Sequence, residues 1–218
     1  MTLAIFDLDN TLIGGDSDTS WGDYLCSKGI VDAEEHAQRH ADYYQDYLDG
    51  KLDIMDFLSF QLEILSQHGM QTLETWRRGY LAELIEPILL PKALALVDHH
   101  RQQGHQLLII TATNRFITEP IAKMFGIDEL IATDPEIIDG RYTGRVEGVP
   151  SFAEGKVTRL AAWLKDRDHS LEGSWFYSDS RNDIPLLEHV ENPVAVDPDD
   201  ALRKEAEKRG WKVITLRD

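Results

Sequence analysis

The first residues in this chain that could do chemistry are Asp7 and Asp9, which follow the apolar run Leu3–Phe6. Four apolar residues without alternation predict a short strand buried on both faces, as in a parallel sheet. Side chains two residues apart in an extended segment point to the same side, so we expect both carboxylates to face one point. Thr11 adds a hydroxyl suited to hold the turn that follows. The plainer alternative is an acidic turn, because Asp is a common turn residue.

Three further polar residues lie where other predicted elements begin or end. Thr111 ends the buried run 106–110, Asp179 ends the run 175–178, and Lys156 opens a predicted helix. Each has a plainer interpretation: a helix cap for Thr111, a solvated side chain for Lys156 and a loop acid for Asp179. Open parallel sheets bind ligands at the carboxyl ends of their strands, so the joint occurrence favours one shared site.

Phosphoryl transfer to a carboxylate uses this set of residues. Asp7 would attack phosphorus and form an aspartyl-phosphate, while Asp9 would protonate the leaving oxygen and then activate a water molecule. Hard oxygen ligands from Asp7 and Asp179 would hold Mg²⁺. Lys156 would offset the negative charge of the phosphate, and Thr111 would donate a hydrogen bond to it.

Two segments with different sequence patterns form the elements that must position these residues. The pattern of residues 16 to about 87 predicts helices throughout, whereas the pattern after them predicts alternating strands and helices. We therefore predict an α/β fold: a doubly wound, Rossmann-like parallel sheet formed by residues 1–15 and 88–218, with a helical-bundle cap, residues 16–87, inserted after the first strand. Asp139-Gly140 predicts a hairpin turn within the core.

The bulk composition excludes some classes of partner. Lys and Arg total 22 against 39 Asp and Glu, which gives a net charge of −17 in 218 residues. Such a surface repels phosphate backbones and anionic lipids, so we expect neither nucleic-acid nor membrane binding. Cys26 is the single cysteine, so no disulfide framework is expected. The start of the sequence shows no signal-peptide pattern, and a cytoplasmic protein is the expectation.

The chain resembles the haloacid dehalogenase-like superfamily, whose four motifs match, in order, Asp7-Leu8-Asp9-Asn10-Thr11, Thr111, Lys156 and Asp179-Ser180-Arg181-Asn182-Asp183. The helical insertion is similar to the cap of phosphoserine-phosphatase-like members. This resemblance implies that Asp7 is the nucleophile and Asp9 the acid/base. It also implies that Asp7, the Asp9 backbone carbonyl and Asp179 bind the metal, with Asp183 and Asn182 supporting the metal and Lys156. The fourth motif departs from many relatives, because Ser178 and Ser180 stand where these have glycine.

The cap carries the evidence on the substrate. In phosphoserine phosphatases a carboxylate nine residues after the nucleophile binds the substrate amine, and here that position is Asp16, with Asp18 close behind. A cap arginine binds the substrate carboxylate in those enzymes, but this chain has no arginine between Arg39 and Arg77. A small amino-alcohol phosphate without a carboxylate is therefore favoured over phosphoserine. Similar members of this branch include histidinol-phosphate phosphatases, and Trp21 could stack on an imidazole ring. The alternative role for Asp16 is a helix cap.

Two other functions use similar residues. A phospho-receiver signalling module also combines acids, a Thr and a Lys on a doubly wound sheet, but such modules are shorter and lack both a cap and an acid two residues past the acceptor. A phosphotransferase would pass the phosphoryl group to another alcohol with the same residues, so the sequence leaves that alternative open.

Overall fold

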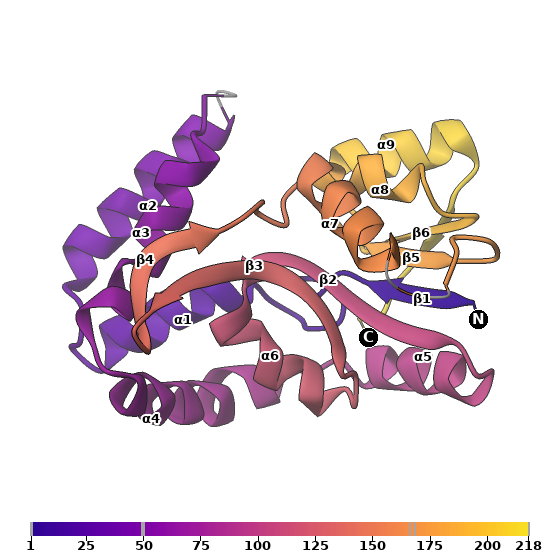
Figure 1. Ribbon diagram of the computed structural model, residues 1–218. Coiled ribbons are helices and arrows are strands. Elements are labelled where there is room, and N and C mark those ends of the chain that lie inside the picture. The colour runs from indigo at the N-terminus through magenta and orange to yellow at the C-terminus, as the bar shows by residue number, and fades with distance from the viewer. Residues whose placement is uncertain (1, 49–50, 166, 168, 218) are drawn as a thin grey trace.

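The computed structural model describes residues 2–48, 51–165, 167 and 169–217, and in this part of the chain one seven-stranded sheet forms the centre of the protein (Figure 1). Its spatial order is β4-β3-β2-β1-β5-β6-β7, and each neighbouring pair is parallel except the antiparallel pair β3 and β4. The strands are β1 (Leu3–Phe6), β2 (Gln106–Asn114), β3 (Glu129–Ile138), β4 (Arg141–Glu147), β5 (Trp175–Ser178), β6 (Asn192–Val196) and β7 (Lys212–Ile214).

Helices cover both faces of this sheet, which confirms the predicted doubly wound fold. On one face lie α5 (Pro91–Gln102) and α6 (Arg115–Met124), and on the other lie α7 (Glu154–Lys165), α8 (Ile184–Leu187) and α9 (Asp200–Arg209) (Figure 1). Successive side chains of a strand point to opposite faces. Accordingly, Phe6 belongs to the hydrophobic core under α5 and α6, whereas Ile5 belongs to the core under α7, α8 and α9.

The predicted cap segment forms α1 (Ser17–Ser27), α2 (Ala33–Leu48), α3 (Ile54–Gln67) and α4 (Met70–Tyr80), followed by a π-helical turn (Leu81–Ile85) and a 3₁₀ turn (Glu86–Ile88). The chain enters and leaves this segment side by side. The Gly14 amide donates to the Ile88 carbonyl at 2.8 Å, and a Cβ atom on Gly14 would lie 3.3 Å from the Leu90 side chain. Glycine therefore suits this close approach of the two connections. The division into a core and a cap domain stays a prediction.

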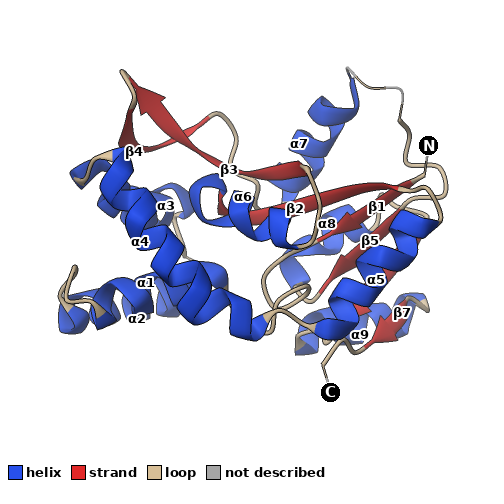
Figure 2. Cartoon of the chain, turned by 90° about the horizontal axis from the view of Figure 1, so that it is seen from below, coloured by secondary structure: helices blue, strands red, loops and turns tan. Residues whose placement is uncertain are grey.

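β2 runs to Asn114, further than the buried run 106–110 indicated, and its neighbour β3 runs to Ile138. The length of these strands carries the β3–β4 hairpin away from the sheet centre and against α3 (Figures 1 and 2). The hairpin turns at Asp139-Gly140, as predicted, with φ values of 51° and 74°. The helical segment therefore packs, through α3, against a hairpin that begins in the central sheet. No helix in the described ranges is long and apolar enough to cross a lipid bilayer.

Candidate active site

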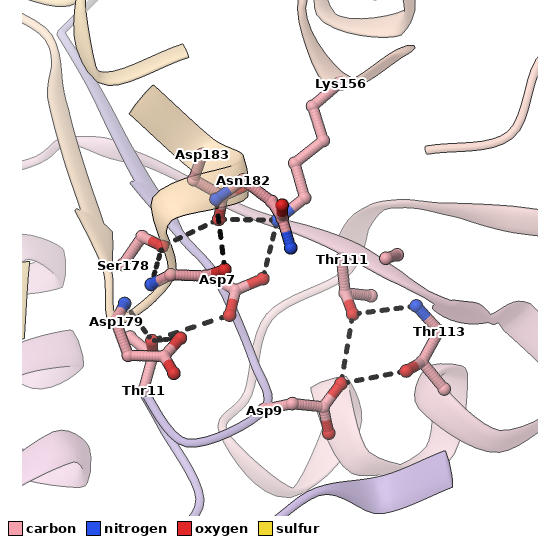
Figure 3. Close-up of polar contacts among 12 residues, drawn as sticks. Asp7, Asp9, Thr11, Thr111, Thr113, Lys156, Ser178, Asp179, Asn182 and Asp183 are labelled. Atoms are coloured by element: carbon pink, nitrogen blue, oxygen red, sulfur yellow. Dashed lines mark hydrogen bonds and ion pairs between the residues drawn. The ribbon is translucent and has the colours of Figure 1, made fainter. Parts of the chain in front are cut away.

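Asp7, Lys156 and Asp183 form a buried charge cluster at the carboxyl end of β1 (Figure 3). Lys156 Nζ donates to Asp7 Oδ1 at 2.8 Å and to Asp183 Oδ2 at 2.7 Å. The Asp7 amide continues the sheet by donating to the Tyr177 carbonyl at 2.9 Å, which fixes where β1 presents its first acid. Lys156 comes from the first turn of α7, so the predicted convergence of distant motifs is present in the structure.

The other oxygen of Asp7 faces Asp179 across Thr11. Thr11 Oγ1 lies 3.5 Å from Asp7 Oδ2 and 3.2 Å from Asp179 Oδ1, and it accepts from the Asp179 amide at 3.1 Å. Two carboxylate oxygens thus lie around one hydroxyl, which has a single proton to donate. Burial and the neighbouring acids raise the pKa of Asp7, although Lys156 opposes the shift, and they raise the pKa of Asp179 to about 7.

This pair of oxygens fits a hard divalent cation. Such ions take carboxylate ligands, and a positive charge between Asp7 and Asp179 would stabilise both ionised forms against burial and mutual repulsion. No group of three or more His, Cys, Asp or Glu side chains in the described part of the chain forms a metal cage. Protein side chains would therefore supply two ligands, and Mg²⁺ usually keeps several water ligands in such sites.

Asp9 lies apart from that cluster, between β2 and the start of α1. Its Oδ2 accepts from Thr113 Oγ1 at 2.9 Å and from Thr111 Oγ1 at 3.3 Å, while Oδ1 accepts from the Ser17 amide at 2.6 Å. Burial and the nearby Asp16 raise the pKa of Asp9 to about 6. A carboxyl with that pKa exchanges a proton near neutral pH, as a general acid must.

Thr113 is a site residue that the sequence analysis missed. Thr111 and Thr113 stand two residues apart on β2, so their side chains point to the same side, as those of Asp7 and Asp9 were expected to do. That spacing could have revealed Thr113. In the structure Thr111 contacts Asp9 and accepts from the Thr113 amide at 3.2 Å; its role as a phosphate ligand stays a prediction.

The two serines that depart from the fourth motif have structural roles. Ser178 Oγ donates to Asp183 Oδ2 at 2.7 Å and accepts from the Ser180 amide at 3.1 Å. Ser180 Oγ in turn accepts from the Asn182 amide at 3.2 Å and caps the short 3₁₀ helix that carries Asp183. Ser178 therefore helps hold the carboxylate that holds Lys156, and the departure from glycine adds support to the site.

Two adjoining hollows surround these residues. The catalytic cleft is lined by Asp7, Asp9, Asn10, Asp16, Thr111, Ala112, Thr113, Phe152, Lys156, Asp179, Ser180, Asn182 and Asp183. The cap cavity, about 370 Å³, is lined by Asp16, Asp18, Thr19, His40, Tyr43, Leu52, Ile54, Phe57, Leu58, Gln61, Leu62, Ala112, Thr113, Asn114 and Phe152. Asp16, Ala112, Thr113 and Phe152 line both, so a molecule with its phosphate in the cleft would place its leaving group in the cap cavity.

The structure separates the three cap residues that were expected to bind substrate. Asp16 and Asp18 line the cap cavity, but Asp16 also caps α1, because its Oδ1 accepts from the Thr19 amide at 2.7 Å. Trp21 is not placed as expected. The residue is 3% exposed, its ring packs among Tyr24, Tyr80 and Phe116, and it lines neither of these two hollows. Trp21 therefore serves the hydrophobic core and not ligand stacking.

The two arginines that flank the arginine-free stretch point elsewhere. Arg39 pairs with Glu63 at 2.9 Å, and Arg77 donates to the Phe116 carbonyl at 2.6 Å. Among the described residues that line the cleft or the cap cavity, the basic side chains are Lys156 and His40. Lys156 is already held between two carboxylates, and the described residues that line the cap cavity include no guanidinium for a substrate carboxylate.

Comparison with known proteins places this architecture in a family. The family model for haloacid dehalogenase-like hydrolases matches residues 4–188 of the sequence, a range that includes all four motifs. The chain belongs to this family. The predicted resemblance is confirmed.

The similarity to known proteins extends over the whole chain. A histidinol-phosphatase from Neisseria meningitidis serogroup C is 47% identical over 219 residues, which cover 99% of both chains. A crystal structure of a protein of unknown function from Bordetella pertussis Tohama I is 44% identical, covers 99% of this chain and 100% of its own, and superposes with a TM-score of 0.94. A substrate-bound phosphoserine phosphatase shares the fold with a TM-score of 0.70 at 16% identity, covering 99% of this chain and 93% of its own. This haloacid dehalogenase-like hydrolase is a phosphatase.

Proposed function

We propose that this phosphatase hydrolyses a small amine-bearing phosphomonoester through an aspartyl-phosphate on Asp7, with L-histidinol phosphate as the substrate. The observation that carries the chemistry is the division of the two acids. Asp7 lies against Lys156 and Asp179, whereas Asp9 lies against Thr111 and Thr113 on the side of the cap cavity. One carboxylate is thus placed to attack and the other to transfer a proton.

The reaction has two displacements at phosphorus. An Asp7 carboxylate oxygen forms a bond to phosphorus as the ester P–O bond breaks, and Asp9 gives its proton to the departing alkoxide. Asp9, now ionised, takes a proton from water, whose oxygen bonds to phosphorus as the Asp7–phosphorus bond breaks. Inorganic phosphate leaves, and Asp7 and Asp9 return to their starting states. Lys156 stabilises the negative charge that develops on the phosphoryl oxygens.

Asp7 and Asp179 would hold Mg²⁺, which, when bound, offsets phosphate charge and favours an in-line approach. The chain's own contribution is to hold these two carboxylates near each other on either side of the Thr11 hydroxyl. Asp183 accepts a hydrogen bond from Lys156, and Ser178 donates one to Asp183, so these two residues hold the Lys156 ammonium group in place.

Replacing Asp179 with Asn should raise the Mg²⁺ concentration for half-maximal activity by about tenfold or more, because one charged ligand becomes neutral. The measurement is p-nitrophenyl phosphate hydrolysis titrated with MgCl₂ after removal of divalent ions with a chelator. Asp128→Asn, an equal change at an exposed site, serves as control and should leave the titration unchanged. Full activity of the wild type in metal-free buffer would contradict the assignment of Asp7 and Asp179 as ligands.

The substrate proposal is supported by the charges of the cap cavity. Its lining includes the acids Asp16 and Asp18, and its one basic residue in the described part of the chain is His40. An ammonium group is attracted to such a cavity, whereas a substrate carboxylate would lack a charge-assisted partner. The 47% identical relative named histidinol-phosphatase supports the same conclusion.

Kinetics over a substrate panel test this proposal. Histidinol phosphate should exceed phosphoserine in kcat/KM by at least about an order of magnitude, or roughly 1.4 kcal/mol of differential transition-state stabilisation. p-Nitrophenyl phosphate, which has neither amine nor carboxylate, reports the common chemistry and serves as control. Equal efficiency on the two natural phosphates, or a preference for phosphoserine, would refute the substrate assignment.

The alternatives give different results in the same assays. A phospho-receiver module would not release phosphate catalytically from p-nitrophenyl phosphate. A phosphotransferase would turn over faster when an alcohol acceptor is added and would yield a new phosphate ester, whereas a hydrolase releases one inorganic phosphate for each nitrophenol.

A further inference from the structure

Asp18 presents a carboxylate oxygen that the folded chain leaves unused. Its Oδ1 is buried and has no hydrogen-bond partner in the part of the chain that the structure describes. The Gln61 side chain of α3 lines the same cavity and opposes the rise in the pKa of Asp18 that burial, Asp16 and Asp9 cause. A buried polar atom without a partner carries a desolvation cost, which is larger when the atom is charged. A cationic group that entered the cap cavity would remove this cost.

Asp16, the acid at the position expected to bind an amine, is in a different situation. It is exposed, and its Oδ1 already accepts the Thr19 amide hydrogen at 2.7 Å as the cap of α1. Asp18 lies within the first turn of that helix, where its carboxylate is not used to cap the helix. Asp16 therefore has a structural role as a helix cap, whereas Asp18 has an oxygen that is free to accept a hydrogen bond from a ligand.

The rest of the cap cavity has the shape and chemistry for a flat ring. Tyr43 of α2 and Phe57 of α3 form one wall, with ring centroids 5.5 Å apart and planes at 70°. Leu52, Ile54 and Leu62 add apolar surface around them. Aromatic walls favour stacked or edge-to-face contact with a substrate ring, and Asp18 then faces a group beside that ring.

We propose that Asp18 binds the substrate ammonium group, and that Tyr43 and Phe57 hold the ring of the same leaving group. This inference rests on the proposed function and narrows it to phosphate esters of ring-bearing amino alcohols. Asp18 is a specificity residue, because it lies in the leaving-group cavity and not among the reacting groups.

A pair of substrates that differ only in the amine isolates this contact. One is histidinol phosphate, and the other is 3-(imidazol-4-yl)propyl phosphate, which keeps the ring and the ester but lacks the amine. In Asp18→Asn, kcat/KM should fall about tenfold or more for the amine-bearing ester and less than about twofold for the other, since an amide gives up the charge attraction at nearly constant shape. Asp16→Asn should change the ratio of the two much less. Asp23→Asn, the same change at an exposed site on α1, controls for net charge.

Further measurements separate the parts of the proposal. L-histidinol, the expected product, should bind the wild type about tenfold more tightly than Asp18→Asn in calorimetry. Phe57→Leu should weaken both ring-bearing esters alike and leave phosphoethanolamine unaffected. Equal loss on the two esters in Asp18→Asn, or a loss of amine preference confined to Asp16→Asn, would overturn the role of Asp18.

If the proposed substrate is wrong, the assays give a different set of results. If histidinol phosphate is not hydrolysed, phosphoethanolamine and ethyl phosphate form an equivalent pair with and without an amine. A preference for the amine that disappears in Asp18→Asn would then support the ammonium site while rejecting the substrate. Turnover of histidinol phosphate that Asp18→Asn leaves unchanged would support the substrate while rejecting the site.

Discussion

Asp7→Asn is expected to lower kcat by about a thousandfold or more, equivalent to about 4 kcal/mol of transition-state stabilisation, while the protein keeps its fold. The substitution removes the attacking charge at nearly constant shape. The new amide oxygen can still accept from Lys156, and the amide NH₂ faces the Thr11 and Asp179 side, where it can donate. Phosphate release from histidinol phosphate and from p-nitrophenyl phosphate measures the effect.

Stability and the covalent intermediate provide the controls for Asp7. The melting temperature of Asp7→Asn should stay within a few degrees of the wild type, because the Lys156 pair with Asp183 remains. Acid quenching of the wild type with labelled substrate should trap a hydroxylamine-sensitive phosphoprotein that is absent from Asp7→Asn. Retention of more than about a tenth of the wild-type kcat would contradict attack by Asp7.

Lys156→Met is expected to damage stability and activity together. Lys156 is 4% exposed and lies 2.8 Å and 2.7 Å from the oxygens of two buried carboxylates. Burial alone would lower the pKa of this ammonium, but Asp183 and Asp7 raise it, so Lys156 stays charged. Its removal leaves two buried acids without their counter-charge, a loss of about 3–5 kcal/mol in the free energy of unfolding. Without Lys156 the pKa of Asp7 rises further, and the loss of its ionised form lowers kcat.

A second substitution separates these two effects. In Lys156→Met with Asp183→Asn, one of the unpaired buried charges is gone, so much of the lost stability should return, as measured by urea unfolding at neutral pH. Catalysis should not return, because the Lys156 ammonium group that stabilises the phosphoryl oxygens is absent. Lys165→Met, a change of the same type at the other end of α7, is the control. A stable and fully active Lys156→Met protein would contradict the proposed role of Lys156.

The sequence alone indicated that Asp7, Thr111 and Asp179 meet at one edge of the sheet, although it did not indicate Ala112, Thr113 or Phe152 of the cleft lining. The run Leu3–Phe6 is apolar without alternation, so it had to be a strand covered on both faces, and its first polar residues had to emerge at the carboxyl end of the sheet. By the same rule Thr111, near the end of β2, and Asp179, directly after β5, lie on the two strands that flank β1. Strand–helix alternation then fixed the doubly wound fold, because parallel strands require crossover helices. These inferences depend on local patterns and on one general property of parallel sheets.

Only the tertiary structure decided how the cap meets the core. Nothing local to residues 129–147 requires the β3–β4 hairpin to extend and pack on α3, because that contact joins segments more than 60 residues apart. Sequence pattern was equally unable to place Trp21, because an aromatic side chain can either stack on a ligand or pack in a core. Its contacts with Tyr80 and Phe116 in the folded chain place it in the core. Asp16 and Asp18 are both acids at the start of one helix. Asp16 accepts the Thr19 amide hydrogen, whereas Asp18 Oδ1 has no hydrogen-bond partner among the described residues, and these are properties of the folded chain that residue type and spacing do not encode.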